Sequence, residues 1–160
     1  MSTHAGNNAD LSPDPREAWH RLLQVSSLVL RELNGSLDAE DRLAITEFDV
    51  LITLDNAPAH EMRMTELAGA TMLSSGGMTR LVGRLERRGF LVRAQDPDDA
   101  RAFRATLTPD GEKKLRDARV THDGALERLI GAHISARDLR ALERALASIL
   151  DGCEAEAAGG

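Results

Sequence analysis

Two stretches in the first third of the chain have hydrophobic residues at helical spacing. Asp14 is a good N-cap and Pro15 fits the first turn, so we expect a helix to begin there and to end at Asn34-Gly35. A linker then leads to a short helix that begins at Thr46 and stops before Pro58. The repeating apolar residues are Trp19, Leu22, Leu23, Val29, Leu30 and Leu33, then Phe48, Leu51, Ile52 and Leu54.

The middle of the chain predicts two further helices close together. Thr65 is expected to cap a brief helix. Ser74 is expected to cap a longer helix that runs to Arg88, with Gly89 in the left-handed conformation that ends many helices.

A β-hairpin is predicted directly after that longer helix. Two strand-like runs, 90–94 and 102–107, flank a polar loop that contains good turn residues. Arg101 lies at the far side of this loop, and Asp99 is placed to pair with it or with Arg93.

Two helices are predicted to complete the chain. Thr108 and Pro109 have the order of an N-cap and a first-turn residue, and they start a long helix. The segment 131–135 interrupts it, and Ser135 caps a last helix that is expected to fray from Gly152 onward.

The order of these elements predicts a mainly α fold with a small β-hairpin, arranged as a winged helix-turn-helix between long flanking helices. The flanking helices carry more apolar residues than a small central module can cover, so we expect them to pack against a second copy of the chain. The expected division is a disordered arm at 1–12, an N-terminal dimerisation helix and linker at 13–45, a DNA-binding lobe at 46–108, C-terminal dimerisation helices at 109–151 and a frayed tail at 152–160.

The predicted helix 74–88 has two contrasting faces. One face is an apolar stripe of Met78, Leu81, Val82 and Leu85. The opposite arc is small and hydroxylated near its start and rich in arginine further along, as suits a helix whose N-terminal half enters the major groove of DNA. The same pattern also fits a solvated helix face. The candidate DNA contacts on this helix are Ser74, Ser75, Gly76, Thr79, Arg80, Arg84 and Arg87.

These candidates have different expected roles. Arg80 is placed to form forked hydrogen bonds to a guanine, and Arg84 and Arg87 to contact phosphates. In the hairpin loop, Arg101 is expected to enter the minor groove with Asp99 beside it.

Charge and composition narrow the possible partners. The 160 residues carry a net charge of −6, but seven arginines against four acidic residues make 74–104 locally basic. With three Phe, one Trp and no Tyr, the chain lacks the aromatic platforms that single-strand binders use. One cysteine, Cys153, excludes a disulfide framework and a cysteine-rich metal site. No stretch is apolar enough to span a bilayer and the N-terminus has no signal-peptide pattern, so we expect a cytoplasmic protein without a cofactor and without a membrane partner.

The segment 67–111 resembles the MarR (multiple antibiotic resistance regulator) family of bacterial transcription factors. The residues that carry the resemblance are Thr79-Arg80, Leu85-Glu86 with Gly89, the wing pattern of Asp96, Asp99 and Arg101, and Leu107-Thr108 with Gly111. The resemblance implies a homodimer that binds an inverted-repeat operator on double-stranded DNA, represses nearby genes and is released by a small aromatic or phenolic effector. It also implies a ligand pocket between the dimerisation region and the DNA-binding lobe.

Other functions stay open at this point. A winged helix can serve as a protein–protein interaction module without DNA binding. A zinc-responsive regulator would need ligands such as His60 with Glu61 or His122 with Asp123. An enzyme is not expected, because the chain has no phosphate-binding glycine loop, nucleophile elbow or HExxH helix. Ala100 stands where many MarR members have a second basic wing residue, and Cys153 is poorly placed for a thiol switch.

Overall fold

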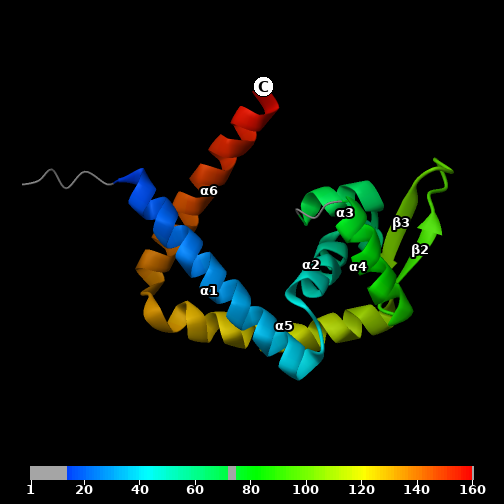
Figure 1. Cartoon of the computed structure of the whole chain (residues 1–160), viewed down its shortest axis with the longest axis horizontal. Helices are drawn as coiled ribbons and strands as arrows, with labels where there is room; N and C mark the ends of the chain where they lie inside the picture. Colours follow the sequence, from blue (N-terminus) through cyan, green and yellow to red (C-terminus); the bar gives the residue numbers. More distant parts are fainter. Residues whose placement is uncertain (1–13, 72–74, 160) are drawn as a thin grey trace, which may run out of the picture.

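The computed structural model describes residues 14–71 and 75–159 (Figure 1). The predicted fold class is confirmed, with a small three-stranded antiparallel sheet among helices. The elements are α1 (Pro15–Asp41), α2 (Ile45–Asn56), η1 (Pro58–His60), β1 (Glu61–Arg63), α3 (Met64–Ala70), α4 (Ser75–Arg87), β2 (Leu91–Gln95), β3 (Phe103–Leu107), α5 (Pro109–Leu129), η2 (Gly131–His133) and α6 (Ala136–Gly159).

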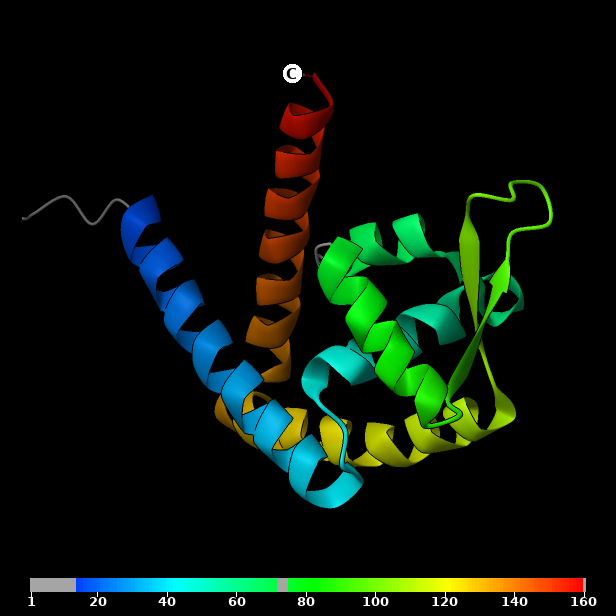
Figure 2. The ribbon, with the colours of Figure 1, turned by 45° about the vertical axis from the view of Figure 1, so that its right-hand side comes forward.

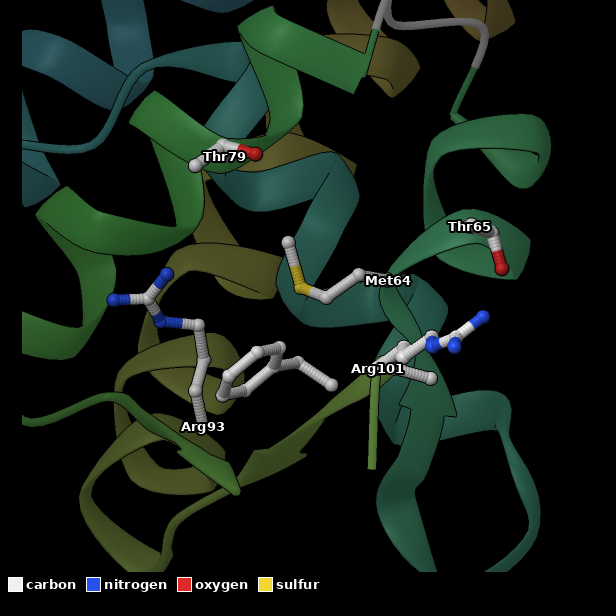
Figure 3. A pocket seen from close by; sticks show the side chains of 7 residues that line it. Met64, Thr65, Thr79, Arg93 and Arg101 are labelled. Atoms are coloured by element: carbon white, nitrogen blue, oxygen red, sulfur yellow. The ribbon is translucent and has the colours of Figure 1, made fainter. Parts of the chain in front are cut away.

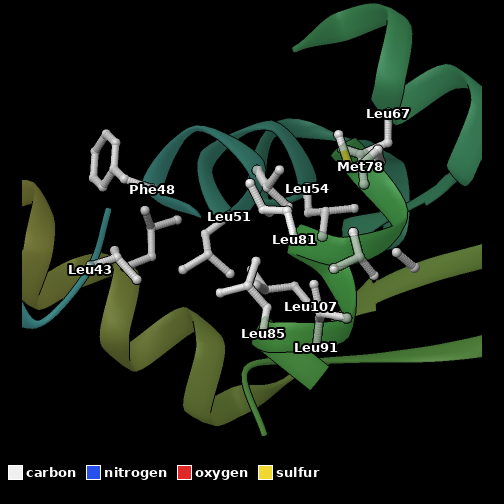
Figure 4. Close-up of a cluster of buried hydrophobic side chains, with 14 of the residues drawn as sticks. Leu43, Phe48, Leu51, Leu54, Leu67, Met78, Leu81, Leu85, Leu91 and Leu107 are labelled. Atoms are coloured by element: carbon white, nitrogen blue, oxygen red, sulfur yellow. The ribbon is translucent and has the colours of Figure 1, made fainter. Parts of the chain in front are cut away.

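A winged lobe is built from α2, α3, α4 and the sheet, whose strand order is β1-β3-β2. Its core is mostly leucine, and the apolar stripe predicted on α4 packs into it (Figure 4). Burial of this stripe turns the opposite, arginine-bearing face of α4 outward. The buried members of the stripe are Met78, Leu81, Val82 and Leu85.

The helix α5 joins the winged lobe to the flanking helices. It leaves the base of β3 and runs beneath the lobe, with α1 packed across it (Figures 1 and 2). After η2 the chain turns into α6, which is separated from the winged lobe in the view of Figure 1. Every residue of α6 is exposed in the single chain.

Several local predictions of helix ends are confirmed. The Asp14 carboxylate accepts the Arg16 amide at 2.9 Å, and the Thr108 hydroxyl accepts the Gly111 amide at 3.1 Å. Gly89 has a φ of +78°, the left-handed conformation expected after α4. The Ser74 cap lies outside the described residues.

The predicted end of the first helix is wrong. The helix α1 continues through Asn34-Gly35 to Asp41 and ends at Arg42, which has a φ of +53°. Leu33 and Leu37 are buried on either side of the glycine, and this packing offsets the roughly 1 kcal/mol that a helical glycine costs. The Asn34 side chain instead accepts the Ile45 amide at 3.0 Å.

Other boundaries also differ from the prediction. The N-cap positions of α2 and α3 are Ala44 and Arg63, not Thr46 and Thr65, and in each case the glutamate three residues later accepts the cap amide. The strand β1 was not predicted, because its three residues have no strand pattern of their own and are held by pairing with β3.

The predicted end of the last helix is wrong as well. The helix α6 does not stop at 151 but continues to Gly159. The alanines and glutamates near its end are good helix formers, so the helix extends past Gly152.

Candidate nucleic-acid interface

The outward face of α4 carries the side chains predicted to meet DNA. Gly76, Thr79, Arg80, Arg84 and Arg87 are exposed on it, while the Ser75 side chain and Ser74 lie outside what the structure describes. The Nε atoms of Arg80 and Arg87 donate to backbone carbonyls one turn earlier, at 3.4 and 3.1 Å. These hydrogen bonds within α4 leave both side chains on the exposed face of the helix.

Arg84 has an additional partner that the sequence did not indicate. Its Nε donates to Glu47 Oε1 at 3.2 Å, and 48% of its side chain is exposed. The Glu47 carboxylate is almost fully buried, also pairs with Arg88 at 3.0 Å and accepts the Ala44 amide. Arg84 therefore links the recognition helix α4 to α2, whether or not it also meets a phosphate.

The wing is the loop between β2 and β3, and Arg101 projects from it. The backbone amide of Arg101 donates to Asp99 Oδ1 at 3.0 Å, so Asp99 orients the backbone of Arg101. The alternative pairing of Asp99 with Arg93 is wrong, because Arg93 forms an ion pair with Glu86 at 2.7 Å. Hydrogen bonding to Arg93 holds the pKa of Glu86 below its ordinary value.

The base of the wing contains a buried carboxylate whose importance the sequence did not reveal. Asp96 accepts hydrogen bonds from the Nε atoms of Arg63 and Arg104, each at 2.7 Å. Hydrogen bonding from Arg63 is the largest effect that holds the pKa of Asp96 well below its ordinary range. Asp96 belongs to the wing pattern in the sequence, but Arg63 is 33 positions away and no local signal connects them.

A hollow of about 340 Å³ lies between the wing, α3 and α4 (Figure 3). Thr79 of α4 and Arg101 of the wing both border it, so these two elements present their candidate DNA contacts on one side of the lobe. Arg93 and Arg101 give the hollow positive charge, and Phe103 and Met64 give it apolar surface. The lining residues are Met64, Thr65, Thr79, Arg93, Arg101, Ala102 and Phe103.

Metal binding finds no support within 14–71 and 75–159. In those segments no group of three or more His, Cys, Asp or Glu side chains is close enough to hold a metal ion. His122 stacks on Phe48 with ring centroids 4.6 Å apart, and His60 Nδ1 lies 2.9 Å from the Asp55 carbonyl oxygen. In the same segments, no helix is both long and apolar enough to cross a bilayer.

Comparison with known proteins identifies the family. Residues 43–103 match the MarR family model. The transcriptional repressor MprA of Escherichia coli (strain K12) is 30% identical over 134 residues, which cover 82% of this chain and 76% of MprA. The chain belongs to the MarR family. It is therefore a transcriptional regulator and not an enzyme, as the resemblance of its recognition helix and wing implies.

Solved MarR-family structures share the fold. AbsC from Streptomyces coelicolor superposes with a TM-score of 0.79 at 26% identity, covering 91% of this chain and 98% of AbsC. Sco3205 from the same organism, solved in complex with DNA, superposes with a TM-score of 0.79 at 22% identity. The superposition covers 91% of this chain and 92% of the Sco3205 chain. The winged lobe and the flanking helices are thus both part of the MarR architecture.

Proposed function

We propose that this MarR-family regulator is a homodimeric repressor that binds a pseudo-palindromic operator and is released by a small aromatic anion. The observation that carries the DNA-binding part is the shared orientation of α4 and the wing. Thr79 and Arg101 border the same hollow, and the exposed arginines of α4 continue from it. This arrangement supports a recognition helix in the major groove with a wing arginine in the adjacent minor groove.

The apolar residues of the flanking helices support the homodimer. All of α6 is exposed in one chain, and both α6 and α1 carry exposed large apolar side chains. Burying this surface against a second copy removes it from water at roughly 25 cal/mol per Å² of apolar area. The exposed apolar residues are Trp19, Leu23, Val25, Leu28 and Leu30 of α1 and Leu139, Leu142, Leu146, Ile149 and Leu150 of α6.

The hollow beside the wing supports release by a small aromatic anion. Phe103 and Met64 offer apolar contact to a ring, and the exposed guanidinium of Arg101 attracts a carboxylate or phenolate, whereas Arg93 is already paired with Glu86. A ligand in this hollow would occupy the space next to Thr79 and Arg101 and so compete with DNA. This position differs from the pocket near the dimerisation region that the family resemblance implies.

In vitro selection of bound duplexes with the purified protein tests the DNA-binding proposal. We expect enrichment of an inverted repeat whose half-sites are centred about one helical turn apart, roughly 34–36 Å. Binding is expected to weaken steeply as salt rises, because phosphate contacts release counterions. A protein–protein interaction module would show neither effect, and the absence of any preferred duplex in dilute buffer would refute the proposal.

Two variants test the assigned contacts. Arg80→Ala is expected to cost about 1–3 kcal/mol of operator affinity and to relax the preference at one base position. Arg101→Ala is expected to weaken operator binding while folding and dimerisation stay intact. Wild-type affinity of both variants would remove these assignments.

Benzoate and hydroxybenzoates are suitable probes of the effector site. We expect them to release the operator from the wild-type protein and to act more weakly on Phe103→Ala, which removes apolar contact from the hollow. Equal release of the operator from both proteins would show that the ligand does not bind in this hollow.

A further inference from the structure

Asp96 is held by groups that are far apart in the sequence. Its side chain has no exposed surface. Arg63 reaches it with Nε at 2.7 Å and a second nitrogen at 3.4 Å, and Arg104 reaches it at 2.7 Å. Oδ1 also accepts the backbone amides of Asp98 at 2.9 Å and Asp99 at 3.2 Å. A buried carboxylate is tolerated only when it is paired and hydrogen-bonded in this way.

The Asp96 carboxylate also separates two positive charges. Arg63 and Arg104 lie opposite each other on β1 and β3. Both side chains are positive, and the charge of Arg104 acts to lower the pKa of Arg63. The carboxylate between them raises the pKa of both guanidiniums. Without it the two arginines would repel each other at the base of the wing.

A continuous series of hydrogen bonds leads from Asp96 to the DNA-facing arginine. The carboxylate fixes the amide of Asp99, and the Asp99 side chain in turn accepts the amide of Arg101 at 3.0 Å. Two backbone hydrogen bonds of 2.9 Å close the loop. The Asp96 amide donates to the Ala102 carbonyl, and the Ala102 amide donates to the Asp99 carbonyl. The conformation of the loop around Arg101 therefore depends on the side chain of Asp96.

The other end of this network lies at the start of the helix-turn-helix. Arg63 is the N-cap position of α3 and the last residue of β1. Asp96 thus ties the first residues of the wing loop to the beginning of the α3–α4 unit. Together with the Arg93–Glu86 ion pair between β2 and α4, this carboxylate holds the wing loop in place relative to the recognition helix.

We infer that Asp96 is a positioning residue for DNA binding, which holds the wing loop at the place where Arg101 reaches the minor groove. The inference rests on the proposed operator binding. Asp96 itself touches no DNA in this arrangement, since it is buried behind the loop. It acts through Arg101, and a role of this kind predicts that the two residues are coupled.

A double-mutant cycle on operator affinity tests the coupling. Asp96→Asn and Arg101→Ala are each expected to weaken binding by about tenfold or more, while the double variant is expected to bind within about twofold of Arg101→Ala alone. Additive losses would overturn the inference, because a general effect on folding would persist without Arg101. Arg63→Gln removes one of the arginines that hold Asp96. The loss of operator affinity that it causes should also vanish when Arg101 is already alanine.

Asp98→Asn is the matched control. It makes the same change of charge two positions away, on an exposed residue of the same loop. Its operator affinity should equal or slightly exceed that of the wild type, because one negative charge near the phosphates is removed. A loss as large as that of Asp96→Asn would show that charge alone matters and would contradict the inference.

Hydrogen exchange of the wing amides separates this inference from the proposed function. Asp96→Asn should accelerate exchange at Asp98, Asp99 and Arg101 in the protein without DNA, while the amides of α5 keep their protection. Unchanged exchange at these three amides would overturn the positioning role. A wild-type protein that binds no duplex would instead refute the operator proposal and the DNA-binding part of this inference with it.

Discussion

Gly111 occupies a position in α5 where a side chain has no room. It is the third residue of the helix and is buried against the junction between α4 and β2. A Cβ atom there would overlap the carbonyl oxygen of Phe90 and would lie 2.8 Å from Leu107 Cδ1. The Phe90 carbonyl already accepts the Thr108 amide at 3.1 Å, so it cannot move without breaking that bond.

We predict that Gly111→Ala destabilises the protein by about 1–3 kcal/mol. Overpacking a tight site costs roughly 1–3 kcal/mol, and displacement of the Thr108 cap adds about 1 kcal/mol. The higher helix propensity of alanine offsets about 1 kcal/mol of this destabilisation. The Thr108 hydroxyl, which accepts the Gly111 amide at 3.1 Å and donates to Gly89 at 2.6 Å, is the first contact expected to be lost.

Gly124→Ala is the matched control for this prediction. It is the same substitution in the same helix, at a position with no atom within 4 Å of the added Cβ. We expect it to stabilise the protein by about 0.5–1 kcal/mol, since only the propensity effect remains.

Urea unfolding followed by far-ultraviolet circular dichroism measures both variants. Protein concentration must be held equal, because the proposed dimerisation would make the apparent stability depend on concentration. The two midpoints should move in opposite directions from the wild type with little change in m-value. A Gly111→Ala protein at least as stable as the wild type would show that the junction can shift freely and would refute the reasoning.

Three further predictions concern buried carboxylates and the dimer. The pKa of Asp96 is lowered from its ordinary value of 3.8, so the ionised side chain stabilises the fold above about pH 3.8, and this contribution is lost as the pH falls further. The free energy of unfolding of Asp96→Asn should therefore fall less steeply than that of the wild type between about pH 5 and pH 3 in an acid titration. Glu47→Gln weakens the contacts of Glu47 with Arg84 and Arg88, so it should lower the unfolding free energy measured in urea by about 1–2 kcal/mol. An unchanged unfolding free energy would show that these two ion pairs do not stabilise the fold. Leu146→Asp on the exposed face of α6 should yield a monomer in sedimentation velocity, and an intact dimer would exclude this face from the interface.

Features that depend on neighbouring residues were predictable from the sequence. The caps at Asp14 and Thr108 and the left-handed Gly89 require only a few residues, and each is confirmed. The stripe on α4 also follows from local spacing and gives both the buried face and the outward one. The hairpin was predicted within one or two residues of its strands because turn residues and β-formers alternate clearly there.

Features that depend on distant contacts were not predictable. The strand β1 exists through its pairing with β3, more than 40 positions later. The helix α1 passes through Asn34-Gly35 because Leu37 is buried beyond the glycine. The partners of Asp96 and Glu47 were missed for the same reason, since Arg63 and Arg84 are separated from them by 33 and 37 positions.

The local excess of arginine in 74–104 serves two purposes that the sequence does not separate. Four of its seven arginines form ion pairs with acidic residues of the winged lobe, which hold α4, the sheet and the wing loop together: Arg84, Arg88, Arg93 and Arg104. Within the part of the chain that the structure describes, the other three take part in no ion pair and are exposed: Arg80, Arg87 and Arg101. A charge that is already paired has less to gain from a phosphate, because the pair must open or share its hydrogen bonds. The salt dependence of operator binding should therefore reflect mainly the three unpaired arginines of each subunit rather than all seven.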